Sequence, residues 1–252
     1  MAIVKLHLVQ TLDELDPLYR IGAEAWRDDA CFNWFFPGGR DHFEDLIPLW
    51  KGILQAYFLE RGKFIVVATV HSDEDKNPNT TKKEEEVVGF AAWERKGTSD
   101  AARRWQGTSL SKKIRRLYLS VQNGWRLFFH PSRRSISVRR LMQLEREIEL
   151  AQNRQPTESW YLCLLGVDPK AQRMGVGRKL LEWGINRSEE EKIPAGLEAT
   201  QAGLPLYQKM GFKQNGWMYF DNGQQKQQVM TRFCFTHSHL LSSNAATSGE
   251  SC

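Results

Sequence analysis

The segment that most constrains this chain runs from Ser159 to Leu181 and reads "SWYLCLLGVDPKAQRMGVGRKLL". Its long apolar run ends at Asp168 and Pro169, which predicts a strand buried on both faces. Two glycines then bracket Val176, and apolar residues at helical spacing follow. A further apolar run, "IPAGLEAT" at 193–200, predicts the second strand of a βαβ unit inside a mixed sheet.

The glycine turn between this strand and helix is suited to an anion. The first N–H groups of a helix have no intrahelical partners, and the helix dipole adds partial positive charge there. Two familiar phosphate patterns do not fit, because GxxxxGK[ST] is absent and Leu180 stands where GxGxxG needs its third glycine. The turn satisfies Q-x-x-G-x-G at Gln172, Gly175 and Gly177. Taken alone, it also fits a structural role, since glycine permits positive φ.

Two stretches together resemble the acetyl-CoA motif of the GNAT superfamily of N-acetyltransferases: "LLGVDPKAQRMGVGRKLLEWG" and "GLEATQAGLPLYQKMGF". Both lie within 160–212, in the order and spacing of that family. The earlier "EAWRDDACFNWFFP" is similar to the branch that contains puromycin N-acetyltransferase and many fungal or bacterial small-molecule acetyltransferases. The resemblance implies an α/β (α+β) fold in which helices flank a single twisted mixed sheet. Two neighbouring parallel strands of that sheet would separate to admit acetyl-CoA.

The resemblance also implies which residues hold the donor. The pyrophosphate would lie on the backbone N–H groups of 172–177, where a side chain at either glycine would block it and arginines would add charge. The end of the preceding strand would face the pantetheine arm and the thioester. The cofactor-binding residues predicted in this way are Leu165, Gly166, Val167, Gln172, Arg173, Met174, Gly175, Val176, Gly177 and Arg178.

Catalytic groups are predicted from the same resemblance and from the chemistry of amines. Tyr207 lies where the family often has a tyrosine that protonates the departing thiolate, although it also fits a half-buried aromatic. Thr200 departs from the asparagine common at its position. An ammonium acceptor must lose a proton before it attacks, so a carboxylate base is expected. The candidates are Glu198, Glu94 and, less centrally, Glu158, and each also fits a solvated charge at a strand end.

An acceptor pocket is predicted near the first helices. Asp29, with its neighbour Asp28, supplies negative charge, and the aromatic faces of Trp34, Phe35 and Phe36 suit a cation. The alternative is that these rings are ordinary core residues. The expected activity is transfer of an acetyl group to a primary amine of a small molecule by direct attack in a ternary complex. The alternatives are a protein or peptide N-acetyltransferase, and a non-catalytic CoA-binding or nucleic-acid-binding module.

Charge and composition limit the other classes of function. The net charge of +5 is concentrated between Lys96 and Arg140, where twelve Lys or Arg residues stand against Asp100 alone. Two stripes at helical spacing predict two inserted amphipathic helices that cover the acceptor site. One stripe is Leu110, Ile114, Leu117 and Val121, and the other is Val138, Leu141, Met142, Glu145 and Ile148, with Glu145 as its one polar position. We therefore do not expect specific nucleic-acid binding.

The expected organisation is one domain over 1–236, with a helical insertion at about 98–155, a polar loop at 71–86 and a loose tail at 237–252. The six histidines and four cysteines show no metal-ligand spacing, so no metal site is predicted. No apolar run reaches the ~20 residues that a transmembrane helix needs, and no signal-peptide pattern opens the sequence. A cytoplasmic monomer or homodimer is expected.

Overall fold

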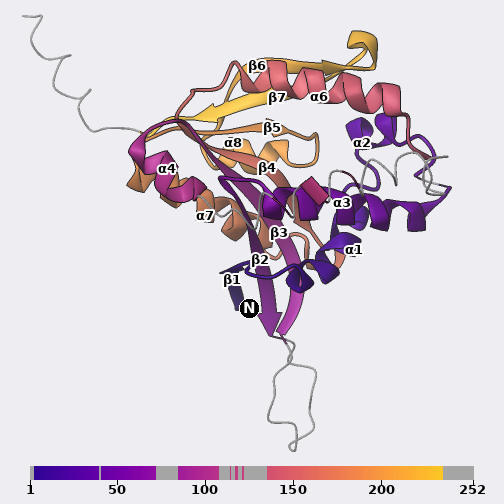
Figure 1. The fold of residues 1–252 in the computed structure, drawn as a ribbon, viewed down its shortest axis with the longest axis horizontal. Helices are drawn as coiled ribbons and strands as arrows, with labels where there is room; N and C mark the ends of the chain where they lie inside the picture. The colour runs from indigo at the N-terminus through magenta and orange to yellow at the C-terminus, as the bar shows by residue number, and fades with distance from the viewer. Residues whose placement is uncertain are drawn as a thin grey trace, which may run out of the picture.

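A mixed sheet of seven strands runs through the chain in the order β1-β2-β3-β4-β5-β7-β6 (Figure 1). The structure is a computed structural model that describes residues 3–39, 41–71, 85–107 and 135–234, together with positions 114, 117, 118 and 121. Every neighbouring pair of strands is antiparallel except β4 and β5. The strands are β1 (Val4–Leu8), β2 (Lys63–His71), β3 (Glu85–Lys96), β4 (Ser159–Val167), β5 (Ala195–Ala199), β6 (Lys213–Phe220) and β7 (Gln225–Arg232).

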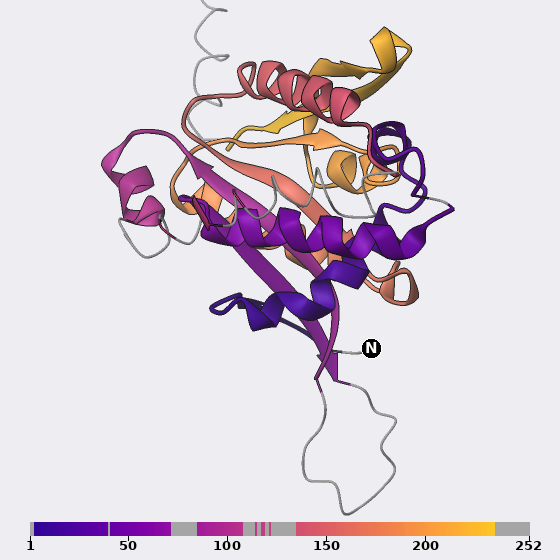
Figure 2. The same cartoon turned by 45° about the vertical axis from the view of Figure 1, so that its right-hand side comes forward.

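Helices cover both faces of this sheet and form two apolar cores. On one face lie α1 (Asp16–Ala25), α2 (Ala30–Phe35), α3 (Leu46–Leu59) and α6 (Val138–Gln152). Figure 2 shows α1 and α3 across the strands of this face and α6 along the β6–β7 hairpin. On the other face lie α7 (Val176–Glu190) and α8 (Leu204–Lys209), with α4 (Asp100–Gln106) packing through Trp105. The mixed sheet with flanking helices confirms the predicted fold class.

The parallel strands β4 and β5 pair over only three residues and then separate. Trp160–Leu162 pairs with Ala195–Leu197, whereas 163–167 of β4 has no register partner in β5. On its other edge β4 carries a bulge, since Leu162 and Leu164 pair with consecutive residues of β3 and Cys163 is skipped. The start of β4 is buried as predicted, but its last five residues are mostly half-buried because the fork opens beside them.

The inserted segment differs from its predicted pattern. In α6 the packed residues are Leu141, Leu144, Ile148 and Ala151, whereas Met142 is 65% exposed. Of the predicted stripe, Leu141 and Ile148 pack, whereas Val138, Met142 and Glu145 are exposed, and the buried Leu144 and Ala151 were missed. The exposed fractions of Ile114, Leu117 and Val121 are 71%, 69% and 67%, so this stripe does not pack. Leu110, the interior of the polar loop and the tail lie outside the described residues.

Within the described residues, no helix is both long enough and apolar enough to span a membrane.

Candidate active site

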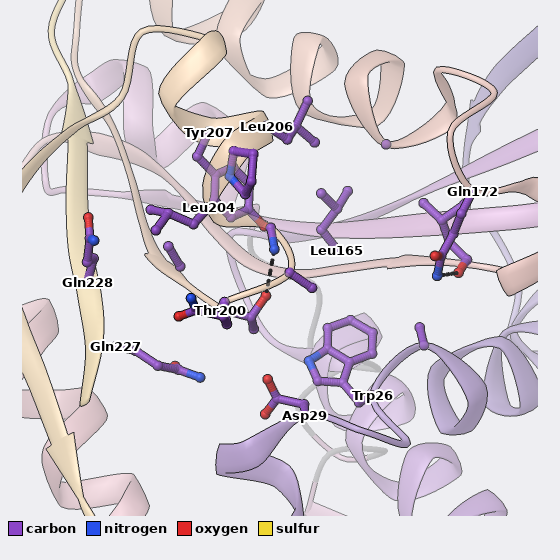
Figure 3. A pocket seen from close by; sticks show the side chains of 18 of the residues that line it. Trp26, Asp29, Leu165, Gln172, Thr200, Leu204, Leu206, Tyr207, Gln227 and Gln228 are labelled. Carbon is purple, nitrogen blue, oxygen red and sulfur yellow. Dashed lines mark hydrogen bonds between the residues drawn. The ribbon is translucent and has the colours of Figure 1, made fainter. Parts of the chain in front are cut away.

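A cavity of about 1550 Å³ opens where β4 and β5 separate. Four segments meet there: the turn between α1 and α2, the end of β4 with the glycine loop, the turn from β5 into α8, and the β6–β7 hairpin. Figure 3 shows Trp26 and Asp29 on one side of this space, Leu165, Leu206 and Gln172 on another, and Gln227 and Gln228 across from them. The cavity is therefore built from segments about 200 residues apart in sequence.

The glycine loop presents bare backbone to this cavity. Asp168 turns the chain at the end of β4 by accepting a hydrogen bond from the Lys170 N–H at 2.8 Å. Gly175 is the N-cap of α7 with φ of +85°, and no atom lies within 4 Å of where its Cβ would be. A Cβ on Gly177 would meet Leu206 at 3.5 Å and Val167 at 3.6 Å. A side chain at either position would occupy the cavity, so the loop fits a large anion seated on the helix start.

Seven of the ten predicted cofactor-binding residues line the cavity. They are Leu165, Val167, Gln172, Arg173, Gly175, Gly177 and Arg178. The other three do not. Val176 is buried in the core, Met174 is 53% exposed away from the cavity, and Gly166 is covered by Trp26, whose Cζ3 would lie 2.7 Å from a Cβ. Gly166 thus allows Trp26 to pack on β4.

The positive charge around the loop is partly engaged. Arg173 lines the cavity with φ of +64°, a left-handed conformation that residues other than glycine rarely adopt. Arg178 forms an ion pair with Glu182 on the same helix, with Nε 2.8 Å from Oε1. Lys209 of α8 adds a third cation to the lining. A polyanion that enters the cavity beside the glycine loop and α8 would therefore meet the positive charges of Arg173, Arg178 and Lys209.

Tyr207 lies on α8 and lines the cavity, although its side chain is 5% exposed. Burial raises the pKa of its hydroxyl above the ordinary value, so the group keeps its proton at neutral pH. Within the described residues its hydroxyl has no hydrogen-bond partner. The neighbouring turn is held by Thr200, whose Oγ1 accepts from the Gly203 N–H at 3.2 Å. Tyr207 is thus a protonated donor beside the fork.

Glu198 lies on β5, on the sheet face opposite Tyr207; it directly precedes the cavity-lining Ala199 but does not itself line the cavity. Its Oε2 accepts a hydrogen bond from the Tyr161 hydroxyl. Its Oε1 is buried and has no hydrogen-bond partner among the described residues. Burial raises the pKa of this carboxyl to about 8, while the charge of Lys96 and a backbone hydrogen bond act in the opposite direction. A buried carboxylate oxygen without a partner is uncommon in proteins and is typical of functional sites.

The other predicted carboxylates have different surroundings. Glu94 lies on β3 opposite Tyr161, with Oε2 3.9 Å from the Cys163 sulfur, and does not line the cavity. Glu158 bridges the buried Arg95 and the backbone of 98–99. Burial would raise the pKa of Glu158, but hydrogen bonds from Ser99, Thr98 and Arg95 lower it to about 2. Glu158 is therefore a structural partner of Arg95, which is neither the predicted base nor the solvated charge that was the alternative.

Of the predicted acceptor residues, the structure brings only Asp29, with its neighbour Asp28, to the cavity. Asp29 caps α2 by accepting from the Phe32 N–H at 2.8 Å, and burial raises the pKa of its carboxyl. Trp34 packs in the core and donates from Nε1 to Asp221 at 3.0 Å. Phe35 and Phe36 are buried in the same core. These three rings have the packing role that was left open as the alternative.

Sequence reasoning missed several cavity residues. Trp26 lies within the stretch "EAWRDDACFNWFFP", but no local feature of that stretch predicts its place in the cavity. Lys209 lies on α8, and the others lie on the last hairpin, which has no local signal of a site because it reaches the cavity only through the strand order β5-β7-β6. The missed residues are Trp26, Lys209, Trp217, Phe220, Gln225, Lys226, Gln227 and Gln228. In the part of the chain that the structure describes, no group of His, Cys, Asp or Glu is arranged to hold a metal ion.

Comparisons with known proteins agree with this geometry. Residues 142–214 match the family model described as an acetyltransferase (GNAT) domain. A stretch of 42 residues is 40% identical to "Probable acyltransferase SID5" of Ajellomyces capsulatus, covering 17% of this chain and 31% of that protein. Another of 69 residues is 36% identical to an uncharacterized N-acetyltransferase of Schizosaccharomyces pombe, covering 27% of this chain and 28% of that protein.

The matched stretches thus span less than a third of the length of either curated relative. Among solved structures, the fold is similar to that of a histone acetyltransferase HPA2 and related acetyltransferase from Corynebacterium glutamicum. The TM-score is 0.56 at 19% identity, over 94% of this chain and 99% of the other. At this identity the likeness concerns the fold alone. The conclusion is that residues 142–214, which hold the glycine loop and its flanking strands, are similar to a GNAT acetyltransferase domain.

Proposed function

We propose that the protein transfers the acetyl group of acetyl-CoA to a primary amine of a small molecule, by direct attack in a ternary complex. The observation that carries this proposal is the fork between β4 and β5, with the glycine loop at its mouth. Residues 163–167 of β4 are not paired with β5, so the main-chain N–H and C=O groups on that edge can pair with the amides of the pantetheine arm. The bare helix start suits the pyrophosphate. The curated relatives are named as an acyltransferase and an N-acetyltransferase, which supports the same reaction class.

The donor supplies an activated thioester, and two side chains of this protein accept and donate the protons that the reaction requires. Glu198 accepts a proton from the acceptor ammonium through Oε1, directly or through water, so that the free amine can attack the carbonyl carbon. As the C–N bond forms and the C–S bond breaks, Tyr207 donates its proton to the leaving sulfur. These two groups approach the fork from opposite faces of the sheet. That arrangement matches a reaction in which the amine arrives on one side of the carbonyl and the thiolate leaves on the other.

The acceptor side of the cavity favours a small organic cation. Asp28 and Asp29 supply carboxylates, and Trp26 and Trp217 supply aromatic faces. Gln227 and Gln228 add amide groups that can bind further polar atoms of an acceptor. Several convergent polar groups in a concave apolar setting are typical of a small-molecule site.

Two measurements test the proposal. Acetyl-CoA should raise the melting temperature of the protein, because a ligand that binds only the folded state stabilises it. Release of free thiol from acetyl-CoA should then accelerate with an amine from a panel of polyamines, amino acids, aminoglycosides and arylamines. Unstructured basic peptides and duplex DNA serve as comparison ligands. A melting shift without thiol release for any amine would leave a CoA-binding module, and turnover of peptides alone would make the protein a peptide acetyltransferase.

A further inference from the structure

The side chain of Tyr161 has a partner that the proposed reaction does not yet explain. Tyr161 lies on β4 one residue before the three-residue pairing with β5 ends, and its side chain is 1% exposed. Its hydroxyl donates to Oε2 of Glu198, the first residue of β5 beyond this pairing. The bond leaves the other oxygen, Oε1, buried and without a partner among the described residues. One oxygen of the carboxylate is therefore held, and the other is buried without a hydrogen-bond partner among the described residues.

We propose that Tyr161 is the positioning residue of the catalytic carboxylate: its hydroxyl holds Oε2 so that Oε1 is presented to the acceptor amine. This inference rests on the function proposed above. A carboxylate on a flexible side chain otherwise has several rotamers, and a general base must lie within hydrogen-bond reach of the proton that it removes. Because the tyrosine ring is packed in the core, its hydroxyl is a fixed point for the carboxylate.

The surroundings of this pair are charged and largely enclosed. The Lys96 ammonium lies 4.5 Å from the centre of the Tyr161 ring and donates to Oε1 of Gln152 at 2.9 Å. It is the cation that favours the ionised form of Glu198. The titratable and charged groups that face this region are Tyr57 and Glu60 from the end of α3, Lys63 from β2, Glu94 and Lys96 from β3, and Tyr161 and Cys163 from β4.

Within this set, only Tyr161 donates a hydrogen bond to the Glu198 side chain in the part of the chain that the structure describes. A hydrogen bond to the charged form of an acid favours that form. Tyr161 therefore both orients the carboxylate and opposes the effect of burial on its pKa. Removing the hydroxyl while keeping the ring should leave Glu198 protonated over a wider pH range and unable to act as a base there.

The test compares Tyr161→Phe with the wild type over pH 6 to 10. The first readout is kcat/KM with acetyl-CoA and the most active amine of the panel above; using one acceptor cancels the contribution of its own pKa. We expect the wild-type rate to rise with a midpoint around pH 8, and the midpoint of the rise in Tyr161→Phe to lie about one pH unit higher. At pH 7 the variant should be about tenfold slower, and near pH 10 it should approach the wild type.

A second readout needs no acceptor. The free energy of unfolding should fall with increasing pH until Glu198 has ionised in the folded protein, and the pH at which this fall ends should be higher in Tyr161→Phe. Tyr19→Phe is the matched control, because it removes a buried hydroxyl that accepts from Gln55 Nε2 at 3.4 Å in a different part of the core. It should leave both pH midpoints unchanged.

The outcomes separate this inference from the proposed function. If Tyr161→Phe is slower by the same factor at every pH, with an unchanged midpoint in both readouts, Tyr161 is a packing residue and the inference is wrong. If Glu198→Gln keeps the wild-type rate and pH profile, the base assigned under the proposed function is wrong, whatever Tyr161 does. A shifted midpoint in Tyr161→Phe that disappears in the double variant with Glu198→Gln supports both.

Discussion

Replacing the Glu198 carboxyl by an amide should stabilise the protein while it removes most of the activity. The carboxyl has a pKa of about 8 in the folded protein, against an ordinary value of 4.5. The folded state therefore binds its proton more tightly than the unfolded state does. Stability must then fall as the pH rises from about 4.5 to about 8, and above that pH the full cost of the buried charge remains.

The size of this cost follows from the two pKa values. A rise from 4.5 to about 8 corresponds to roughly 5 kcal/mol of unfolding free energy at alkaline pH. Local relaxation and water entry reduce such penalties, so we expect Glu198→Gln to gain ~2–3 kcal/mol at pH 8.5. For a chain of this size that is a rise in melting temperature of about 5–10 °C. The gain should shrink steadily toward pH 5, where the wild-type carboxyl is neutral in the folded state.

Thermal and urea unfolding at pH 5.5, 7 and 8.5 measure this difference. Glu158→Gln is the comparison with the opposite sign, because hydrogen bonds hold its pKa at about 2 and its stabilising contribution is present above the ordinary value and lost only as the pH falls toward 2. That variant should be less stable than the wild type at pH 7 and 8.5, since it weakens the partner of the buried Arg95. A Glu198→Gln variant that is less stable at pH 8.5, or whose gain is the same at pH 5.5, would refute the assignment of a desolvated carboxylate.

Three further predictions concern the cavity. Gly177→Val and Gly175→Val should both remove the rise in melting temperature caused by acetyl-CoA, but only Gly175→Val should also lower stability without ligand, because φ is +85° there; an undiminished ligand shift in both would exclude the pyrophosphate cradle. Tyr207→Phe should lower kcat by about 10²-fold with an unchanged dissociation constant for acetyl-CoA, and a loss confined to binding would return Tyr207 to a packing role. Asp29→Asn keeps an oxygen that can cap α2 and removes the charge, so KM for a cationic amine should rise about 3- to 10-fold while stability changes little; equal KM values would remove Asp29 from the acceptor site.

The local parts of this protein could be predicted from its sequence. The run that became β4, the turn at Asp168 and the glycine before α7 depend on apolar patterning and on φ preferences of single residues, which act over a few positions. The buried face of α6 was predicted only in part, at Leu141 and Ile148 but not at Leu144, because packing against the neighbouring β6–β7 hairpin decides which apolar residues of the helix are buried.

The candidate site could not be predicted in the same way, because its residues are brought together only by the order and register of the strands. Nothing local to Glu198 distinguishes it from Glu94 or Glu158, since each is a glutamate near the end of an apolar strand. Tyr161 reaches Glu198 because the parallel register brings their strands side by side just before the fork, and burial at that point raises the pKa. Glu158 is paired instead because its strand begins beside Arg95. The sequence by itself thus determined the glycine turn before α7 and the class of fold. Strand register and burial decided which carboxylate is held with one oxygen unpartnered, because both depend on residues that are distant in the chain.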